Sequence, residues 1–294
     1  MADQDDERER RLEIWRSIKE LGADNISAIS LRGLGAYGGA QGIWVDKART
    51  GHIVTNGVTV GLLHTGKHYP DDISEDGLIY HYPKTARPPS RDAAEVTATK
   101  NAASLNLPIF VILPGETGRI RRVRLGWVED WEDDSGLFLV LFGDEPPTYV
   151  PPAEQDAVFS LTDDTPNRTS TVKIRPRQQV FRFQVLAQYG SKCAVCSISH
   201  PSLLKAAHLR GKREKGSDDR RNGLPLCSTH HDAYDAHLFA IHPDSLSIIT
   251  SPAISPTAIG LGTSILATKH KKPHRQALAW RFELTQSKWR TKLA

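Results

Sequence analysis

Three cysteines and one histidine in the C-terminal third of the chain have the spacing of a metal site. Cys193 and Cys196 are separated by two residues, and Cys227 and His230 repeat that spacing further along. Two thiolates at this spacing can hold one face of a tetrahedral ion, and a Cys-x-x-His pair supplies the other two ligands. We therefore expect a structural Zn²⁺ that ties together loops too short to be held by a hydrophobic core. The alternative is that the cysteines are free and pack as small hydrophobic side chains.

The cysteine count and the chain's N-terminus bear on the compartment. The chain has 3 cysteines, and an odd number crowded into one segment suits metal ligation in a reducing compartment better than a disulfide framework. The first residues, MADQDDERERR, are charged and lack the apolar core of a signal peptide, and no apolar run is long enough to span a membrane. We therefore expect a cytoplasmic protein with no membrane partner.

Three further side chains, His208, Asn222 and His231, are interleaved with the expected zinc ligands. They lie in the segments YGSKCAVC, LLKAAHLR and DDRRNGLPLCSTHHDAYDAHLFAI, which follow one another in this order. With these segments the chain resembles the HNH nuclease family, as found in McrA-like restriction enzymes and in colicin nucleases. The resemblance implies a ββα-metal module in which His208, at the end of the first strand, is the general base that activates water. Asn222 would brace the loop and orient His208, and His231, on the helix, would bind the catalytic divalent ion.

The chemistry of phosphodiester hydrolysis asks for such parts. An imidazole titrates near neutral pH and can take a proton from water, and a divalent cation stabilises charge that develops on the phosphate. Asp235 lies four residues after His231, so both side chains project from one helical face and could share the ion. A cap or a salt bridge to a nearby arginine is the alternative role of Asp235. Many family members carry a metal ligand directly before the base, where this chain has Ala207. Such a shell holds more water, which suits Mg²⁺, and Mn²⁺ is the other candidate ion.

The elements that must position these residues fall into two domains. Residues 5–22 place Leu12, Trp15, Ile18 and Leu21 on one helical stripe, which predicts an amphipathic helix appended to the first domain. From about residue 27 to 143, short apolar runs alternate with Gly-, Pro- and Asp-rich turns, interrupted by a helical stretch at 91–105. This pattern predicts a mostly β domain, so we assign residues 1–145 to the helix and this domain.

The rest of the chain reads as a linker and a second domain. Residues 146–177 lack an apolar period and are rich in Pro, Thr, Asp and Asn, which indicates a linker. We assign residues 178–294 to the nuclease domain, with a helix before the cysteines and a last helix. We expect Trp280, Phe282 and Trp289 of the last helix to pack in the core, and stacking on nucleic acid is the alternative. The expected fold class is therefore α+β.

The charge is unevenly distributed between the two halves. Residues 1–150 carry 17 Lys and Arg against 23 Asp and Glu, a net charge of −6. Because the whole chain has 38 and 34, residues 151–294 carry the remaining 21 and 11, a net charge of +10. A basic domain attracts the phosphate backbone of DNA, although a solvated basic face without a ligand has the same composition.

The segment 61–83, GLLHTGKHYPDDISEDGLIYHYP, carries a second resemblance. It is similar to the core of SRA domains, the PUA-like twisted sheets or barrels that read 5-methylcytosine by base flipping. The resemblance implies that Tyr69 and Tyr82 stack on the extruded base and that Asp72 accepts a hydrogen bond from the cytosine amino group. Tyr80 lies on the same strand face as Tyr82 and could take its role. A flipped base needs aromatic rings on both faces and a polar group on its Watson–Crick edge. An ordinary turn with strand tyrosines is the alternative.

Together these observations predict a modification-dependent DNA endonuclease of the McrA-like, type IV class. Its partner would be double-stranded DNA that carries modified cytosine. We allow for a homodimer, because restriction enzymes commonly cut both strands as dimers, although no segment identifies a dimer face. One alternative is an HNH endonuclease whose first domain reads another mark, such as a phosphorothioate linkage, or an unmodified sequence. An alternative from another class is a non-catalytic DNA-binding protein with a degenerate nuclease.

Overall fold

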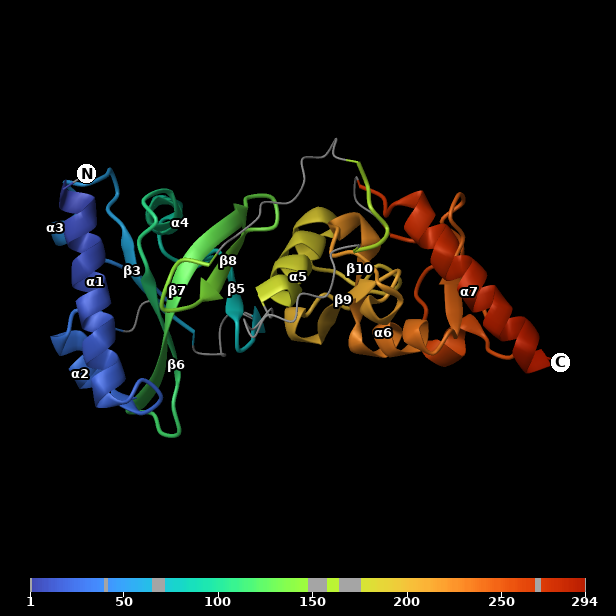
Figure 1. The fold of residues 1–294 in the computed structure, drawn as a ribbon, viewed down its shortest axis with the longest axis horizontal. Coiled ribbons are helices and arrows are strands. Elements are labelled where there is room, and N and C mark those ends of the chain that lie inside the picture. Colours follow the sequence, from blue (N-terminus) through green and yellow to red (C-terminus); the bar gives the residue numbers. More distant parts are fainter. Residues whose placement is uncertain are drawn as a thin grey trace. The chain divides into compact units, whose positions relative to one another are not determined.

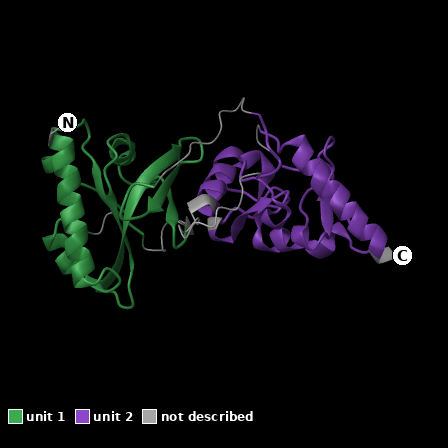
Figure 2. Ribbon diagram, viewed as in Figure 1, with its two compact units in different colours: residues 1–149 green, residues 150–294 purple. Residues whose placement is uncertain are grey.

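The computed structural model describes residues 2–39, 42–64, 72–147, 158–163, 176–267 and 271–293. The chain divides into two compact units, Met1–Tyr149 and Val150–Ala294 (Figure 2). Within the described ranges, no helix is both long enough and apolar enough to cross a membrane. Both units contain helices and strands, and the predicted α+β fold class is confirmed.

The first unit is built on one eight-stranded sheet. Its strands are β1 (Ile26–Ser27), β2 (Ile43–Val45), β3 (Thr59–Leu63), β4 (Asp72–Ile73), β5 (Gly77–His81), β6 (Ile109–Pro114), β7 (Ile120–Glu132) and β8 (Leu137–Phe142). The hydrogen-bonded path runs β2-β3-β6-β7-β8-β5-β4, and β1 pairs with β7 beside it. Figure 1 labels the central strands of this path. Strands β3 and β6 run parallel, while the other pairs of this sheet are antiparallel.

Alternating side chains of the central strands bury two separate cores. In β6, Phe110 joins the core beneath helix α1 (Ala2–Leu21), whereas Ile109 and Val111 join the core on the side of helix α4 (Pro89–Ser104). Successive side chains of a β-strand point to opposite faces of the sheet. Both faces of the sheet are therefore covered, which explains why the run IFVIL is apolar without interruption. The short helices α2 (Ala28–Gly33) and α3 (Lys47–Thr50) complete the unit.

Helix α1 confirms the predicted N-terminal helix, but it is part of this core rather than an appendage to it. Leu21, the last residue of the predicted stripe, is 57% exposed, whereas Arg11 is completely buried. The Arg11 guanidinium contacts Glu7 at 2.7 Å and donates hydrogen bonds to the carbonyl groups of Thr59 and Pro108. A buried charge is tolerated only with such partners. These bonds fix α1 to the sheet, because Thr59 begins β3 and Pro108 directly precedes β6.

The second unit contains a ββα element framed by two longer helices. Helix α5 (Pro176–Tyr189) precedes the hairpin of β9 (Leu204–His208) and β10 (Gly223–Cys227), and helix α6 (Ser228–Asp235) follows it directly. A second hairpin, β11 (Phe239–Ile241) with β12 (Ile248–Thr250), leads to the last helix, α7 (Arg275–Leu293) (Figure 1). Single 3₁₀ turns connect these elements: η1 (Pro201–Leu203), η2 (Lys212–Glu214), η3 (Arg220–Asn222) and η4 (Pro256–Ile259).

Part of the predicted linker belongs to the second unit. Residues 148–157 and 164–175 lie outside the described ranges, but residues 158–163 between them are described. Thr162 forms an antiparallel β-bridge with Gly216 in the loop between β9 and β10. In the same loop, the backbone N–H of Ser217 donates to the Leu161 carbonyl, and the N–H of Asp163 donates to that of Lys215. Residues 158–163 therefore pair with this loop along its edge. We call residues 158–163 the docked segment.

Candidate active site and metal centre

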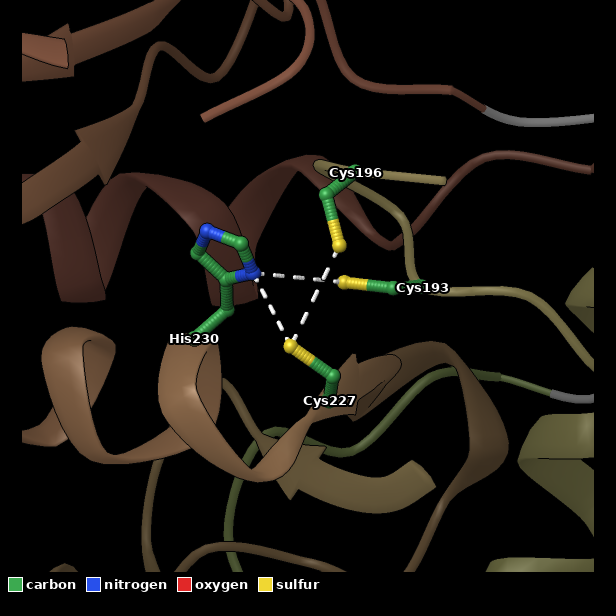
Figure 3. A group of neighbouring side chains, drawn as sticks. All are labelled: Cys193, Cys196, Cys227 and His230. Atoms are coloured by element: carbon green, nitrogen blue, oxygen red, sulfur yellow. Dashed lines mark hydrogen bonds between the residues drawn. The ribbon is translucent and has the colours of Figure 1, made fainter. Parts of the chain in front are cut away.

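The four expected zinc ligands converge on one point (Figure 3). Cys193, Cys196, Cys227 and His230 each offer one ligand atom, and these atoms all lie within 4.8 Å of one another. The Sγ atoms of Cys196 and Cys227 are 3.9 Å apart. The Nδ1 atom of His230 lies 3.7 Å from Cys193 Sγ and 3.0 Å from Cys227 Sγ. Residues up to 37 positions apart in the chain are thus brought to a single cluster.

The cluster has the dimensions that a tetrahedral zinc ion requires. Zn–S bonds of about 2.3 Å and Zn–N bonds of about 2.0 Å place two sulfurs about 3.8 Å apart and a sulfur and a nitrogen about 3.5 Å apart. The separations of 3.9 Å and 3.7 Å agree with these values, and the 3.0 Å contact is shorter. Three soft thiolates and one imidazole are also the donor set that zinc prefers. These residues can therefore hold Zn²⁺, in agreement with the sequence prediction.

Local structure explains why these four side chains meet. Cys193 and Cys196 lie in the turn after α5, where the N–H of Ala194 donates to the carbonyl of Pro225 in β10. Cys227 ends β10 and is the N-cap residue of α6, which puts His230 in the first turn of that helix. Burial raises the pKa of the Cys196 thiol to about 12 and lowers the pKa of His230. Metal binding to such thiols must therefore displace protons.

His208 is the last residue of β9 and is placed there by the hairpin register. It lies opposite Gly223, the first residue of β10. The ring of Phe181 in α5 stacks on the imidazole, with centroids 3.9 Å apart and planes 7° apart. The absence of a side chain at Gly223 leaves room for Phe181, because a Cβ atom at residue 223 would come within 2.6 Å of both Phe181 and Val185. The hairpin and α5 together thus set the plane of the imidazole.

Asn222 is completely buried and joins the two ends of the loop between β9 and β10. Its side-chain oxygen accepts a hydrogen bond from the Arg210 N–H, and its amide group donates to the carbonyls of Arg210 and Ser217. Its own backbone carbonyl accepts from the N–H of Leu209, the residue after His208. These four bonds are what the predicted bracing role would need.

Sequence reasoning missed Asp218. Its Oδ1 atom lies 3.0 Å from His208 Nε2, and its Oδ2 atom lies 2.7 Å from Lys212 Nζ. Burial alone would raise the pKa of Asp218, but the hydrogen bonds from His208 and Lys212 outweigh it and lower the pKa. The sequence does contain a signal, the adjacent carboxylates of Asp218 and Asp219. It does not show which of the two faces the histidine, because that depends on the path of the loop.

On α6, His231 and Asp235 face each other as the four-residue spacing predicts. His231 Nδ1 lies 3.3 Å from Asp235 Oδ2 and 3.7 Å from Asp232 Oδ1. The other Asp235 oxygen lies 3.6 Å from Arg281 Nη2 in α7. Both roles considered for Asp235 therefore have a structural counterpart, a shared face with His231 and a salt bridge to an arginine.

The predicted base-binding residues of the first unit are only partly described. Tyr69 lies outside the described residues, and Asp72 is described as the first residue of β4 but not in its side chain. Tyr80 is 2% exposed, in the core on the α4 side of the sheet. Tyr82 packs on Phe138 at a centroid distance of 4.4 Å and keeps part of its ring exposed.

A network of polar groups holds the Tyr82 ring in place. Its hydroxyl donates to Asp133 Oδ1 at 2.8 Å, and the same carboxylate contacts Lys100 Nζ at 2.6 Å. The Lys100 ammonium also lies 5.9 Å from the centre of the Tyr82 ring. Burial and the hydrogen bond to Asp133 raise the pKa of Tyr82, so the hydroxyl stays protonated at neutral pH. Of Tyr80 and Tyr82, only Tyr82 therefore offers an ordered ring with accessible surface.

Comparison with known proteins identifies the second unit's chemistry. Residues 193–242 match the HNH endonuclease family, a segment that runs from the first cysteine past β11. The chain therefore carries an HNH endonuclease domain and is a nuclease, as its sequence predicted. No curated protein matches the chain.

Solved structures similar to the chain include a restriction endonuclease and an SRA domain. The modification-dependent TagI restriction endonuclease has a TM-score of 0.31 and 15% identity, over 88% of this chain and 91% of that chain. The SUVH5 SRA domain bound to fully methylated CG DNA has a TM-score of 0.27 and 22% identity, over 40% of this chain and 81% of that chain. The SUVH5 SRA domain in complex with methylated CHH DNA has a TM-score of 0.27 and 20% identity, over 40% of this chain and 81% of that chain.

Proposed function

We propose that this nuclease hydrolyses phosphodiester bonds of double-stranded DNA and that it does so in response to modified cytosine. The observation that carries the catalytic half is the ββα element of the second unit. It places His208 at the end of β9 and His231 with Asp235 on α6, and the Cys₃His cluster ties β10 and α6 to the turn after α5. These elements would carry a general base and a divalent-metal site on one small frame.

The chain's own residues divide the work of hydrolysis. His208 takes a proton from the attacking water, and Asn222 keeps the loop that follows His208 in place. His231 and Asp235 would hold Mg²⁺ or Mn²⁺, which would stabilise the charge on the phosphate and the leaving oxygen. The zinc ion on the Cys₃His cluster would hold the frame and take no part in the chemistry.

The reading half of the proposal rests on the resemblance of residues 61–83 to SRA domains and on the geometry of Tyr82. We assign the stacking ring to Tyr82 rather than Tyr80, because Tyr80 is 2% exposed and the ring of Tyr82 is anchored through Asp133. Tyr69 would cover the other face of an extruded base, and Asp72 would accept a hydrogen bond from its amino group. An anchored ring stacks at a low entropic cost.

The test is cleavage by the wild-type chain of matched duplexes of one sequence. They differ only in the mark they carry: 5-methylcytosine, 5-hydroxymethylcytosine, a phosphorothioate linkage or none. We expect metal-dependent cutting of the duplexes with modified cytosine and at least tenfold less of the unmodified duplex. Equal cutting of all four would refute the reading half alone. Specific cutting of the phosphorothioate duplex would show that the enzyme reads this linkage instead of modified cytosine. An absence of cutting with every metal tested would refute the catalytic half.

A further inference from the structure

Asp218 and Phe181 together fix the imidazole of His208 in two directions. Phe181 covers one face of the ring, and Asp218 Oδ1 lies 3.0 Å from Nε2. The side chains of His208 and Asp218 are only 19% and 23% exposed. A contact held at this burial is screened less by water than a surface ion pair.

We propose that Asp218 is the positioning residue of the catalytic histidine and that it makes Nδ1, not Nε2, the nitrogen that takes the proton from water. This deepens the proposed function and rests on the role of His208 in it. A neutral imidazole carries one N–H, and an ionised carboxylate only accepts hydrogen bonds. Nε2 must therefore carry the hydrogen that Asp218 accepts, which leaves the lone pair on Nδ1.

Asp218 is kept ionised by a second partner. The Lys212 ammonium lies 2.7 Å from Asp218 Oδ2, the oxygen that does not face His208. Lys212 also lies 3.6 Å from Asp163 in the docked segment. Acidic and basic groups thus alternate along a series of contacts that ends at the imidazole: Asp163, Lys212, Asp218 and His208. The β-bridge between Thr162 and Gly216 holds the loop that presents both Lys212 and Asp218.

The charged groups on the elements packed against β9 have partners of their own. Arg182 of α5 donates to the carbonyl of Leu204, and Asp232 of α6 lies 3.8 Å from Lys205. His231 of α6 faces Asp235 at 3.3 Å. Asp218 is accordingly the carboxylate that hydrogen-bonds to His208, and Lys212 is the cation that modulates it.

The proton balance of the step follows from this arrangement. Nδ1 takes a proton from water as the water oxygen forms a bond to phosphorus, and the imidazole becomes an imidazolium stabilised by Asp218. The bond from phosphorus to the leaving oxygen breaks, the oxygen keeps the electron pair, and a solvent water protonates it. The imidazolium then returns its Nδ1 proton to solvent. Nε2–H and Asp218 keep their hydrogen bond throughout.

The central experiment compares Asp218→Asn with Asp219→Asn in the full, zinc-loaded chain. Asp219 is a matched control, because it lies in the same loop but caps η3 and pairs with Arg221. ¹⁵N NMR of the DNA-free protein reports which ring nitrogen of His208 carries the hydrogen and the midpoint of its titration. We expect Nε2–H in the wild type and in Asp219→Asn. In Asp218→Asn we expect a mixture of tautomers and a midpoint lower by about one pH unit, because the imidazolium has lost a neighbouring negative charge.

Cleavage kinetics supply the second readout. We expect Asp218→Asn to lower kcat about a hundredfold and to move the acidic limb of the pH–rate profile to lower pH by the same unit. Lys212→Met keeps Asp218 but removes its cation, so we expect the limb to move to higher pH. A residue that only supports the fold would lower the rate without moving the limb. Lys212→Met also provides the test if Asp218→Asn does not fold, as judged by zinc content and circular dichroism.

The two proposals fail in different ways. If the NMR titration and tautomer of His208 are the same in the wild type and in Asp218→Asn, the positioning role is wrong, whether or not the chain cuts DNA. If Nε2 is unprotonated in the wild type, the assignment of Nδ1 as the base is wrong. If the NMR results are as expected but the wild type cuts no DNA, the proposed function fails and the Asp218–His208 pairing stands.

Discussion

Two histidines carry the two halves of the proposed chemistry, and their surroundings differ accordingly. His208 is stacked on Phe181 and bonded to Asp218, which suits a group that must hold one orientation. His231 is 24% exposed and lies beside the exposed carboxylates of Asp232 and Asp235, 3.3 Å from the latter, which suits a metal ligand. Removing each side chain should therefore give a different response to added metal.

We expect His208→Ala to lower kcat by about 10²–10⁴-fold while DNA affinity and folding persist, because a general base acts in the transition state. Raising the Mg²⁺ or Mn²⁺ concentration should not restore the rate. His231→Ala should also lose activity, but higher metal concentration should restore part of it. The measurement is single-turnover cleavage of a labelled duplex across a metal titration, with gel-shift binding in parallel. Near wild-type cleavage by His208→Ala would remove His208 from the role of base.

At this scale, local spacing predicts ligands well and long-range pairing poorly. Cys193 and Cys196 form half a metal site by spacing alone, so the cluster of four ligands could be found from the sequence. Asp218 could not, because its contact with His208 depends on how the loop folds back over ten residues. Arg11 is a similar case: its complete burial depends on Glu7 and on two carbonyls far along the chain.

At the scale of the elements, the Cys₃His cluster joins short pieces of the second unit. It links the turn after α5, the end of β10 and the first turn of α6. Apparent zinc binding to structural sites is worth about 10–16 kcal/mol at pH 7, as much as or more than the whole stability of a typical domain. The second unit should therefore not keep its fold without the ion.

We expect about one zinc per chain by elemental analysis, and we expect Cys196→Ser to leave the second unit unfolded or the protein insoluble. His200→Ala, which changes a histidine outside the cluster, should keep both zinc and fold. The pKa of Cys196 is raised to about 12, so protons compete with zinc for this thiolate, and zinc should be released as the pH falls and held more tightly as it rises. Folded, active protein with far less than half an equivalent of zinc would contradict the assignment.

Several elements were predictable because their apolar period is local. The stretch 91–105 is the helix α4, Pro89–Ser104, and the run of residues 109–113 lies in the buried strand β6. Which strands pair is not local information. The parallel pairing of β3 with β6 and the docking of residues 158–163 on the β9–β10 loop depend on contacts between distant segments. For the same reason the periodicity of α1 showed its apolar stripe but not that the helix completes a core.

At the scale of the whole molecule, the proposed function assigns reading and cutting to different units of one chain. The first unit belongs to the acidic part of the sequence, with a net charge of −6 over residues 1–150, and the second to the basic part, at +10. A basic unit binds any duplex through its phosphates, so it adds affinity without preference. The preference must then come from the first unit, and a change there should separate the two activities.

We expect Asp72→Ala to lose the preference for duplexes with modified cytosine while zinc content and metal-dependent background nicking stay intact. Loss of the Asp72 carboxylate would leave the amino edge of a flipped cytosine unpaired. The cost is roughly 1–3 kcal/mol, on the order of ten- to a hundredfold in affinity. Competitive binding to methylated and unmodified duplexes of one sequence measures this preference. Asp71→Ala, which removes the adjacent carboxylate, is the matched control.

The aromatic half of the same experiment uses Tyr82→Ala, which should weaken binding by a stacking contribution of about 1–3 kcal/mol. Tyr80→Ala removes a ring that is 2% exposed, so its expected effect is lower stability of the first unit rather than a specific loss of binding. If the wild type discriminates and Asp72→Ala discriminates equally well, the reader survives but its base-reading carboxylate lies elsewhere.

Gly223, the residue opposite His208 in the hairpin, limits which side chains this hairpin can accommodate. Any side chain at residue 223 would push on Phe181 and Val185, each 2.6 Å from the position of its first carbon. Phe181 is also the ring that lies flat on His208. A side chain at residue 223 would therefore displace the aromatic support of the His208 imidazole. The alignment of the proposed base therefore depends on the space beside Gly223 staying free of a side chain.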